Sequence, residues 1–580
     1  RYPSLAAASD MNYRWSIAPI QDLQVKRLSE EFDLSPLLAQ CLLNRGHDDF
    51  ENVDQFLRPK LKNLSDPFTL PNIERAVERL LAARESGEKV VVFGDYDVDG
   101  VTSTALIIEV LRELGWKIDY YLPHRLEEGY GLSQDGVENC LKKVKPDLIL
   151  AVDCGSTAVD TIRWLKDRGM DVIVLDHHQV TDPEPEAYAL VNPQLKGGPL
   201  CELCSVGLAF KLAHAVIKAC RELNQPPSVH DYDMRPLLDL VALGTVADLV
   251  PLKGENRVMV TAGLKRLNQT RRAGLLALME IAQVRDEVGV FEISFQLSPR
   301  INAAGRLVNA DTALRLMLSD NLEEARQLAQ ELDTYNKERQ MIEKGIADQA
   351  IGAIRSQFDP ERDYVIVQGE MYWHIGVVGI VASRVLREFY RPTIILGGEG
   401  TEWRGSGRSV SGFDLAEALR TCDDLLVRHG GHAMAAGMSI DPKNLEEFRK
   451  RINAYAEKQI SKECLKPIIH LDADVPLAEL SLERMEELAR LNPFGAGNSA
   501  LQFASRRVSL QSQPHRMGRD QQHVKFWVSD GRSSYEVLWW NCGKSKLPSG
   551  SFDIAYAPQI NDYNGRRSVQ LKLLDWRPAT

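Results

Sequence analysis

The sequence has no long hydrophobic run. No apolar stretch in its 580 residues approaches the roughly 18 to 20 residues needed to cross a bilayer. The first ten residues contain alanine and serine but no apolar core of about 7 to 15 residues, so they do not resemble a secretory signal. The first methionine is Met11. We expect a cytoplasmic protein with no membrane partner, in which residues 1–20 form an N-terminal tail.

Cysteine is scarce and scattered. Nine cysteines in a chain of this length fit a reducing cytoplasm better than a disulfide framework. Cys201 and Cys204, with His214 and Cys220 farther along, could form a zinc site. However, Cys220 continues a helical apolar pattern that begins at Val206, so we favour a core position for it over zinc binding.

Positive charge is scarce over most of the chain. The net charge is −11, which by itself argues against a nucleic-acid-binding protein. Residues 500–580 differ, because their twelve Lys/Arg and six Asp/Glu give +6 and leave −17 for the first 499 residues. Trp527, Trp540 and other aromatics are interleaved with these cations, as stacking on single-stranded nucleic acid requires. Strand alternation would instead place about half of these aromatics in a barrel core.

Acidic residues follow three short runs of apolar, β-branched residues. Runs 90–94, 148–152 and 171–175 lead into Asp95-Tyr96-Asp97-Val98-Asp99-Gly100, Asp153-Cys154-Gly155 and Asp176-His177-His178. Such runs, separated by helical patterns, predict buried strands of a parallel sheet. Because ligands bind at the carboxyl ends of these strands, we expect the acids and histidines to converge. Their chemistry suits Mn²⁺ or Mg²⁺ better than a thiolate-held metal.

Each aspartate has a simpler interpretation as a helix N-cap or turn residue. Three acids within residues 95–99 are harder to explain that way, because grouped carboxylates repel unless cations or protons compensate. A further patch, residues 242–251, carries Asp248 in an apolar setting where an unpaired carboxylate would be costly. Two metal ions about 3.5–4 Å apart support phosphoester hydrolysis. Asp153, on the middle strand of the pattern, is our candidate for the residue that bridges them.

Length and patterning predict several domains. We expect a helical N-terminal region (21–89), an α/β catalytic domain with a parallel sheet (90–320), a long connecting helix (321–358), a second, smaller α/β domain (359–466) and a C-terminal OB-like β-barrel (467–580). Within the second α/β domain we expect a helix over residues 415–427. The barrel should have five strands, four of them at 524–528, 535–539, 552–557 and 569–573.

These motifs carry a family resemblance. The stretches at 94–100, 153–155, 176–178 and 244–248 resemble the four metal motifs of the DHH phosphoesterase superfamily. Those at 125–133, 298–306, 373–379, 405–409 and 430–437 resemble the RecJ family of bacterial single-strand-specific exonucleases. The resemblance extends over roughly residues 20–575 in the right order. At Phe93 the sequence departs from the many superfamily members that have a histidine at this position.

The resemblance implies a two-metal site and a second domain that closes over the substrate. The implied metal ligands are Asp95, Asp97, Asp99, Asp153, His177 and Asp248. The implied catalytic residues are Asp153, His178, Arg408 and His432. The implied substrate-binding residues are Arg125, Tyr130, Arg300, Asn302, Arg306, His374, Ser406, Arg408 and His432.

Elementary chemistry agrees with several of these roles. The Arg408 guanidinium can bind a phosphate with two parallel hydrogen bonds, and His374 precedes a helix whose N-terminus could hold another phosphate. For Arg300 the alternative is a structural salt bridge. Glycines in the 405–407 and 430–431 stretches would let the backbone approach a nucleic-acid strand, although ordinary turns would also explain them.

From the resemblance we expect an exonuclease that uses two Mn²⁺ or Mg²⁺ ions and degrades single-stranded DNA from the 5′ end to mononucleotides, in DNA repair and recombination. A helicase and a single-strand-binding protein would be its protein partners. One alternative is a phosphodiesterase of the same superfamily that cleaves dinucleotides or short oligoribonucleotides, which would not need the N-terminal region or the basic barrel. The other is a non-catalytic replication scaffold on the same fold, in which some of the metal-binding acids would be missing.

Overall fold

The structure is a computed structural model that describes residues 13–124, 127–129, 131–543, 545–563 and 565–579. The chain divides into two compact units. The central unit comprises Asp54–Arg339 and Leu491–Ser499, and the flanking unit comprises Arg1–Val53, Gln340–Arg490 and Ala500–Thr580. Within the part of the chain that the structure describes, no helix is both long and apolar enough to cross a membrane.

The central unit is built on a five-stranded sheet of order β3-β2-β4-β5-β6, and every neighbouring pair is parallel. Its strands are β2 (Lys89–Gly94), β3 (Lys117–Tyr121), β4 (Leu148–Val152), β5 (Asp171–Leu175) and β6 (Ala189–Val191). The middle strands are buried on both faces because their residues alternate between two separate apolar cores. The predicted parallel sheet is therefore confirmed.

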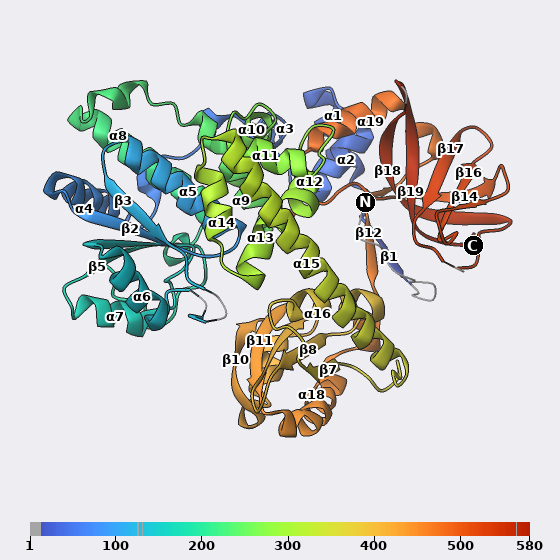
Figure 1. The fold of residues 1–580 in the computed structure, drawn as a ribbon. Helices are drawn as coiled ribbons and strands as arrows, with labels where there is room; N and C mark the ends of the chain where they lie inside the picture. Colours follow the sequence, from blue (N-terminus) through green and yellow to red (C-terminus); the bar gives the residue numbers. More distant parts are fainter. Residues whose placement is uncertain (1–12, 125–126, 130, 544, 564, 580) are drawn as a thin grey trace. The chain divides into compact units, whose positions relative to one another are not determined.

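Helices cover both faces of this sheet (Figure 1). One face packs on α4 (Ile73–Ser86), α5 (Val98–Glu113), α8 (Ser205–Leu223) and α9 (Leu238–Ala247), and the other on α6 (Gln134–Val144) and α7 (Val159–Lys166). Further helices are α3 (Phe50–Leu57), α10 (Gly254–Leu267), α11 (Ala273–Ile281), α12 (Val290–Glu292), α13 (Ser298–Leu307) and α14 (Asp311–Leu318). Cys220 is buried in α8 as a core residue.

The predicted connecting helix is α15 (Leu322–Arg355), whose residues up to Arg339 belong to the central unit and whose later residues belong to the flanking unit. The segment Leu491–Ser499 also belongs to the central unit, although the residues on either side of it do not. The backbone N–H of Leu252 donates to the Ala496 carbonyl at 2.7 Å, and the buried Arg257 guanidinium donates to the Asn492 carbonyl at 2.7 Å. A short stretch from late in the sequence thus completes the central unit.

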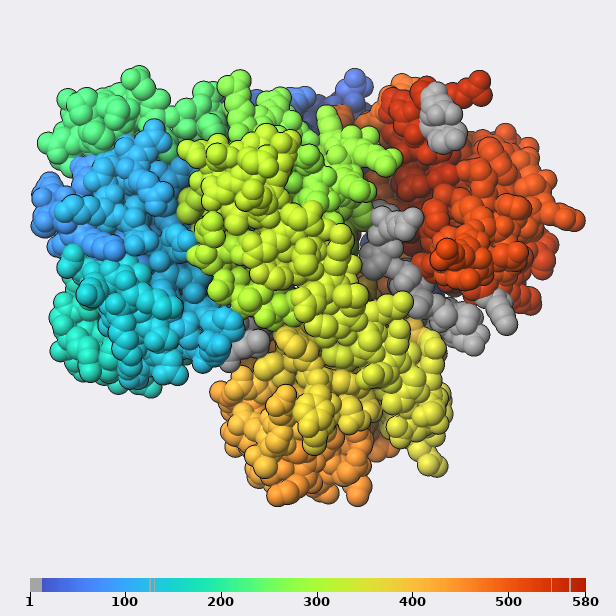
Figure 2. Space-filling view, viewed as in Figure 1, coloured from blue at the N-terminus to red at the C-terminus, as the bar shows by residue number. Residues whose placement is uncertain are grey.

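The flanking unit contains a second mixed sheet of order β10-β11-β9-β8-β7, with β7 and β8 parallel and the other pairs antiparallel. Its elements are β7 (Ile366–Met371), α16 (Val378–Phe389), β8 (Thr393–Gly398), β9 (Trp403–Arg408), α17 (Leu415–Arg420), β10 (Leu426–His432), β11 (Ala435–Ile440) and α18 (Leu445–Gln459). The end of α15 and α16 cover one face, and α17 and α18 cover the other. In Figure 2 the yellow and orange residues of this domain form one continuous body.

The helix predicted for residues 415–427 is wrong beyond Arg420. α17 ends there, and Leu426 already begins the strand β10 that pairs with β11. The apolar residues Leu426, in that strand, and Leu425, directly before it, pack against the core of this domain, whereas helical periodicity alone would have kept them on α17.

The C-terminal domain is the predicted five-stranded barrel. Its ring of paired strands is β14 (Phe503–Leu510), β18 (Ser551–Tyr563), β19 (Arg566–Pro578), β17 (Ser534–Trp539) and β16 (His523–Ser529), closed by pairing of β14 with β16. β13 (Ala473–Asp474) and β15 (His515–Met517) extend it. α19 (Leu482–Leu488) precedes the ring in the sequence. At the other end of the chain, β1 (Arg14–Ile17) is followed by α1 (Asp22–Phe32) and α2 (Pro36–Asn44). β1 pairs in parallel with β12 (Ile468–Leu471).

Candidate metal centre and anion site

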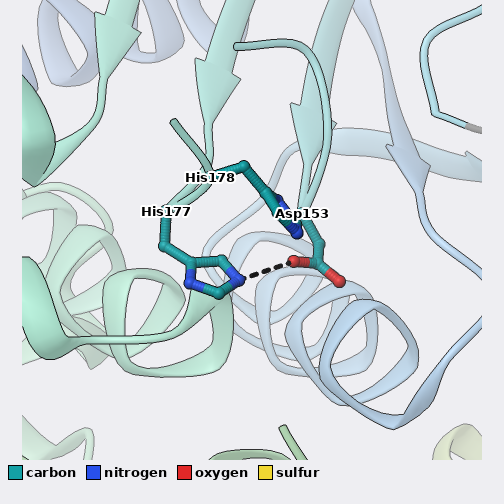
Figure 3. A group of neighbouring side chains, drawn as sticks. All are labelled: Asp153, His177 and His178. Atoms are coloured by element: carbon teal, nitrogen blue, oxygen red, sulfur yellow. Dashed lines mark ion pairs between the residues drawn. The ribbon is translucent and has the colours of Figure 1, made fainter. Parts of the chain in front are cut away.

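Carboxylates and imidazoles from four segments of the central unit meet at the carboxyl end of its sheet. Potential ligand atoms fall into three groups, each within 4.8 Å: Asp95, Asp97 and Asp153; Asp99, Cys204 and Asp248; and Asp153, His177 and His178. Figure 3 shows the two histidines, which follow β5, pointing toward Asp153, which follows the neighbouring strand β4. The structure therefore brings together all six metal ligands predicted from the sequence.

Asp153 has a distinctive position in this cluster. It is a member of two of the three ligand groups and is almost fully buried. Its backbone has a positive φ of 62°, a conformation that few residues with a Cβ adopt and that aspartate tolerates better than most. The hydroxyl of Ser205 donates to Asp153 Oδ1 at 2.8 Å. The strained backbone and the hydrogen bond from Ser205 hold the Asp153 carboxylate where it belongs both to the group with Asp95 and Asp97 and to the group with the two histidines.

The first helical turns supply further hydrogen bonds to the cluster. Asp97 caps α5 by accepting from the Gly100 N–H at 3.1 Å, so the N-cap interpretation is confirmed for this residue, while its role as a metal ligand stays a prediction. Asp99 accepts from the backbone N–H groups of Ser205 and Val206, at 2.7 and 2.8 Å. These donors are the first amides of α8, and the positive end of a helix stabilises a carboxylate.

His178 is oriented by Asp176, an acid of the predicted cluster that was not among the implied metal ligands. The Asp176 carboxylate lies 2.7 Å from His178 Nδ1 and also accepts from the backbone N–H groups of His177 and Ser156, at 2.8 and 3.0 Å. With Nδ1–H donated to Asp176, the ring presents Nε2 to the cluster. Asp176 therefore acts on the site through His178, and not as a ligand.

His177 fits a metal ligand in its surroundings. Its Nε2 atom has no hydrogen-bond partner among the described residues. It lies 3.8, 3.5 and 3.6 Å from oxygens of Asp99, Asp153 and Asp248. A buried nitrogen without a partner, facing carboxylate oxygens at these distances, matches the oxygen-rich donor set with imidazole that Mn²⁺ and Mg²⁺ accept. The residues present therefore fit the predicted divalent ions.

The crowding of negative charge appears in the pKa values of the metal-free protein. Burial, followed by the charge of Asp97, raises the pKa of Asp99 to about 7. Burial and the charges of Asp99 and Asp97 raise the pKa of Asp248 to about 8, and burial with neighbouring carboxylates raises that of Asp153 well above its usual value. Burial opposes protonation of His178, but its hydrogen bond and charge interaction with Asp176 raise its pKa to about 9.

We expect metal ions to stabilise the protein more strongly at higher pH. The folded-state pKa values of Asp99 and Asp248 lie above the unfolded value of 3.8, so the metal-free fold loses stability as pH rises through about 7 to 8. Mn²⁺ binding displaces those protons and removes the repulsion. The melting temperature measured with EDTA should fall between pH 6 and pH 8.5, and the increase caused by Mn²⁺ should grow. Asp248→Asn should flatten both trends, and a metal-free melting temperature that rises across this window would contradict the prediction.

Phe93 and Cys204 are two residues near the metal centre whose roles were not predicted from the sequence. Phe93, at the position where many relatives have histidine, is fully buried and stacks on Tyr121 with ring centroids 5.6 Å apart. Its side chain belongs to the apolar core and offers no ligand. The sequence offers Cys204 only as part of a possible zinc site, but its sulfur lies in the group with Asp99 and Asp248. Only the start of a helix at Ser205 could have indicated this placement.

The predicted substrate residues of the central unit have varied surroundings. Asn302 Oδ1 accepts from the Val98 N–H at 3.1 Å, which places it beside the first acidic motif. The Arg300 guanidinium forms an ion pair with the buried Asp333 at 2.9 Å, which is the structural alternative for this residue, and its contact with substrate stays a prediction. Arg306 is in the last turn of α13. Arg125 and Tyr130 lie outside the described residues.

In the flanking unit, several predicted residues lie near the N-terminus of α16 or share a sheet face with residues that do, and they form a candidate anion site. Arg408 and His432 each pair with Ala435 of β11, so their side chains emerge on one face of the sheet with only a small residue between them. Arg408 Nη1 donates to Ser406 Oγ at 2.9 Å. A Cβ atom added at Gly379 would lie 3.1 Å from Arg408 Nη2 and 3.0 Å from Ser406 Oγ. His374 Nδ1 accepts from the Gly376 N–H at 3.1 Å in the turn that precedes α16.

The glycines of β9 have a different role from the predicted one. A Cβ atom at Gly405 would lie 2.4 Å from Leu396, and one at Gly407 would lie 2.5 Å from Leu415. These glycines therefore make room for core leucines, and neither a nucleic-acid contact nor a turn explains them. In β10, Gly431 is packed against Ala435, whereas a Cβ atom at Gly430 would meet nothing within 4 Å. Only Gly430 keeps the open backbone that the prediction required.

The parallel sheet with its cluster of carboxylates and histidines defines a metal-dependent phosphoesterase of the DHH type. The DHH family, N-terminal domain, matches residues 89–245, the DHHA1 domain residues 362–458 and the RecJ OB domain residues 471–575. The chain belongs to the RecJ family of single-stranded-DNA-specific exonucleases, as its similarity to curated members shows.

The relatives match along nearly the whole chain. The Bacillus subtilis RecJ exonuclease is 36% identical over 575 residues, which are 97% of this chain and 70% of the relative. The Escherichia coli RecJ exonuclease is 34% identical over 561 residues, 93% of this chain and 95% of the relative. The crystal structure of Thermus thermophilus RecJ in complex with Mn²⁺ superposes with a TM-score of 0.83 at 31% identity, covering 98% of this chain and 80% of that one.

Proposed function

We propose that this protein is a metal-dependent exonuclease that degrades single-stranded DNA from its 5′ end to mononucleotides during DNA repair and recombination. The observation that carries the proposal is the position of Asp153, whose carboxylate is shared by two ligand groups in the central unit. A carboxylate so placed is what two ions acting on one phosphodiester require. The RecJ relatives, named as single-stranded-DNA-specific exonucleases, support the substrate and the exonuclease activity.

Different residues of the central unit would have different roles in hydrolysis. Two bound ions would supply activation of a water molecule and stabilisation of the leaving oxygen. Asp95, Asp97 and Asp153 would hold one ion, and Asp99, His177 and Asp248, with Asp153, would hold the other. His178, whose Nδ1 is fixed by Asp176 at 2.7 Å, would direct its other ring nitrogen toward a phosphate oxygen. Its fixed ring loses little freedom when the substrate binds.

The anion site of the flanking unit would hold the backbone of the strand. The Arg408 guanidinium, the Ser406 hydroxyl and the first amides of α16 can surround one phosphate group. His374 and His432 would contact the same phosphate or its neighbour. The predicted residues would thus act from two domains: one set would hold the metal ions, and the other would hold the strand and contact the phosphate on which charge develops.

The barrel would capture single strands through its exposed tryptophans. Trp527 and Trp540 are 42% and 40% exposed, whereas Phe526 and Tyr556 are buried, so the aromatics divide between surface and core as alternation predicted. We expect Trp527→Ala and Trp540→Ala each to weaken binding of long single strands roughly tenfold, because one lost base stack costs about 1–3 kcal/mol. Hydrolysis of oligonucleotides too short to reach the barrel should change little. Equal losses on short and long substrates would show that these tryptophans support the fold instead.

A cleavage assay tests the proposed function directly. The substrates are long single strands labelled at the 5′ or 3′ end, the corresponding duplex and a dinucleotide, each with Mn²⁺, with Mg²⁺ and with EDTA. Early release of labelled mononucleotide from the 5′ end of single strands alone is expected. Preference for the dinucleotide would favour the small-substrate phosphodiesterase, and metal-independent binding without cleavage would favour the scaffold. We further propose a cytoplasmic location and cooperation with a helicase and a single-strand-binding protein.

A further inference from the structure

Cys204 places a buried thiol at the metal centre. It is the residue directly before α8, and it is fully buried. Its sulfur lies within 4.8 Å of ligand oxygens of Asp99, in the first turn of α5, and Asp248, at the end of α9. The thiol donates to Thr245 Oγ1 in α9 at 3.5 Å. The roles given above to the cluster, in which oxygen and imidazole ligands hold Mn²⁺ or Mg²⁺, leave this sulfur unused.

His177 offers a nitrogen to the same two carboxylates. Its Nε2 atom lies 3.8 and 3.6 Å from oxygens of Asp99 and Asp248. A zinc ion with four ligands and bonds of about 2.0–2.3 Å holds its ligand atoms about 3.3–3.6 Å apart. The histidine distances are only slightly longer, and the sulfur of Cys204 lies within 4.8 Å of both carboxylates. Two carboxylate oxygens, an imidazole nitrogen and a thiol sulfur are therefore available to one ion.

This donor set suits a different class of ion from the one that hydrolysis requires. Mg²⁺ and Mn²⁺ prefer oxygen ligands, and a catalytic ion needs an open position for water or substrate. Zn²⁺ binds thiolate and imidazole readily, is bound more strongly than Mn²⁺ by most protein sites, and is stable with four protein ligands. A closed set of four protein ligands would leave no position for the attacking water.

We propose that Cys204, together with Asp99, His177 and Asp248, binds a thiophilic ion such as Zn²⁺ in place of Mn²⁺ and thereby blocks hydrolysis. As the sulfur–metal bond forms, the thiol proton passes to solvent, and no oxidant or reductant is needed. The inhibition rests on the proposed function, whereas the binding of the ion does not. The two parts can therefore be tested separately.

Co²⁺ is the probe for the binding of the ion. It accepts the same ligands as Zn²⁺ and, unlike Zn²⁺, reports a bound thiolate by an intense charge-transfer band in the near ultraviolet. We expect this band when Co²⁺ is added to the metal-free parent protein. Cys204→Ser should lose the band, although its small side chain can still donate to Thr245. Asp248→Asn should weaken the band, because it removes one of the carboxylate ligands.

Cys201→Ala is the matched control. The Cys201 thiol donates to the Pro193 carbonyl at 3.2 Å, and its loss should leave the cobalt band unchanged. This control distinguishes an ion at the metal centre from a zinc pair formed by Cys201 and Cys204. The melting temperature of each variant in EDTA shows whether it folds, and Cys204→Ala serves as a second variant without a thiol at this position.

Inhibition is measured as the loss of single-stranded DNA hydrolysis when Zn²⁺ is added at a fixed Mn²⁺ concentration, relative to the rate of the same protein in Mn²⁺ alone. The Zn²⁺ concentration that halves the rate should rise roughly tenfold or more in Cys204→Ser. Loss of a group that only supports the ligands already costs roughly 10–100-fold in metal affinity, and loss of a ligand should cost at least as much. Cys201→Ala should be inhibited as the parent protein is.

The proposed zinc site would be overturned if the parent protein showed no cobalt band. A band that persisted in Cys204→Ser, was unchanged in Asp248→Asn or was lost in Cys201→Ala would overturn it as well. Equal inhibition of the parent protein and Cys204→Ser by Zn²⁺ would contradict the inhibitory role. Failure of the parent protein to cleave single strands in Mn²⁺, with the cobalt bands as expected, would instead overturn the proposed function alone.

Discussion

Asp153→Asn should abolish hydrolysis of single-stranded DNA while leaving strand binding largely intact. The substitution keeps the size of the side chain and its hydrogen bond from Ser205, but it removes the negative charge that both ligand groups share. One remaining ion cannot both activate water and stabilise the leaving oxygen. Turnover with Mn²⁺ and strand affinity with EDTA are the two measurements. Hydrolytic activity with Mn²⁺ above a few per cent of the parent's would contradict the assignment of Asp153 as the shared ligand.

Asparagine is the appropriate replacement because of the backbone. Asp153 has a φ of 62°, which asparagine tolerates and alanine does not, so loss of activity in Asp153→Ala could reflect local misfolding. Asp160→Asn, in the first turn of α7, is the matched control because that side chain is 99% exposed. Its activity and metal binding should equal those of the parent protein. The number of Mn²⁺ ions bound by Asp153→Asn should fall.

His432→Ala should lower turnover roughly 100-fold or more at saturating single-stranded DNA, with metal binding unaffected. A donor aimed at charge that develops during the reaction acts mainly in the transition state, so its loss lowers kcat. Loss of a donor that binds substrate and transition state equally would instead raise KM and leave kcat unchanged. The register that places His432 and Arg408 on one face through Ala435 supports a contact with phosphate. Normal turnover would refute a part for this domain in the chemistry.

Two comparisons sharpen the His432 experiment. His429→Ala is the control, because His429 lies on the same strand, β10, but its Nε2 is 3.0 Å from Asp423 Oδ1. It should leave kcat and KM unchanged. Arg408→Ala should show a mixed pattern, with kcat lowered and KM raised, because its guanidinium lies at the helix N-terminus that would hold the strand. A rise in KM alone for both His432→Ala and Arg408→Ala would assign the anion site to binding only.

The sheet and the acid cluster could be predicted because both depend on local sequence patterns. Buried parallel strands are continuous apolar runs, and residues that follow them must meet at one edge, so the placement of Asp95, Asp153 and His177 followed from periodicity alone. The strand β10 could not be predicted, because Leu425 and Leu426 fit a helix as well as a strand. Pairing with β11 decides between them, and pairing is not a local property.

The supporting residues of the site escaped prediction for a related reason. Ser205 and Cys204 come from a helix start far from the acidic motifs in sequence, and only packing of α8 on α5 brings them to Asp99 and Asp153. Asp176 was visible in the sequence, but whether it faces an ion or His178 depends on side-chain orientation. Charge and spacing in the sequence predict which residues come together in the site. Their hydrogen-bond partners can be assigned only from the three-dimensional structure.

The segment Leu491–Ser499 has a consequence for how the protein is made. A ribosome must add 160 residues after Arg339 before the last piece of the central unit has been synthesised. At about 5–20 residues per second this interval lasts roughly 8–32 seconds. During that time Arg257 lacks the carbonyl of Asn492, and Leu252 lacks its backbone partner at Ala496. The nascent chain must therefore carry an incomplete nuclease domain. That domain is completed only after the second α/β domain, with the candidate anion site, has been synthesised.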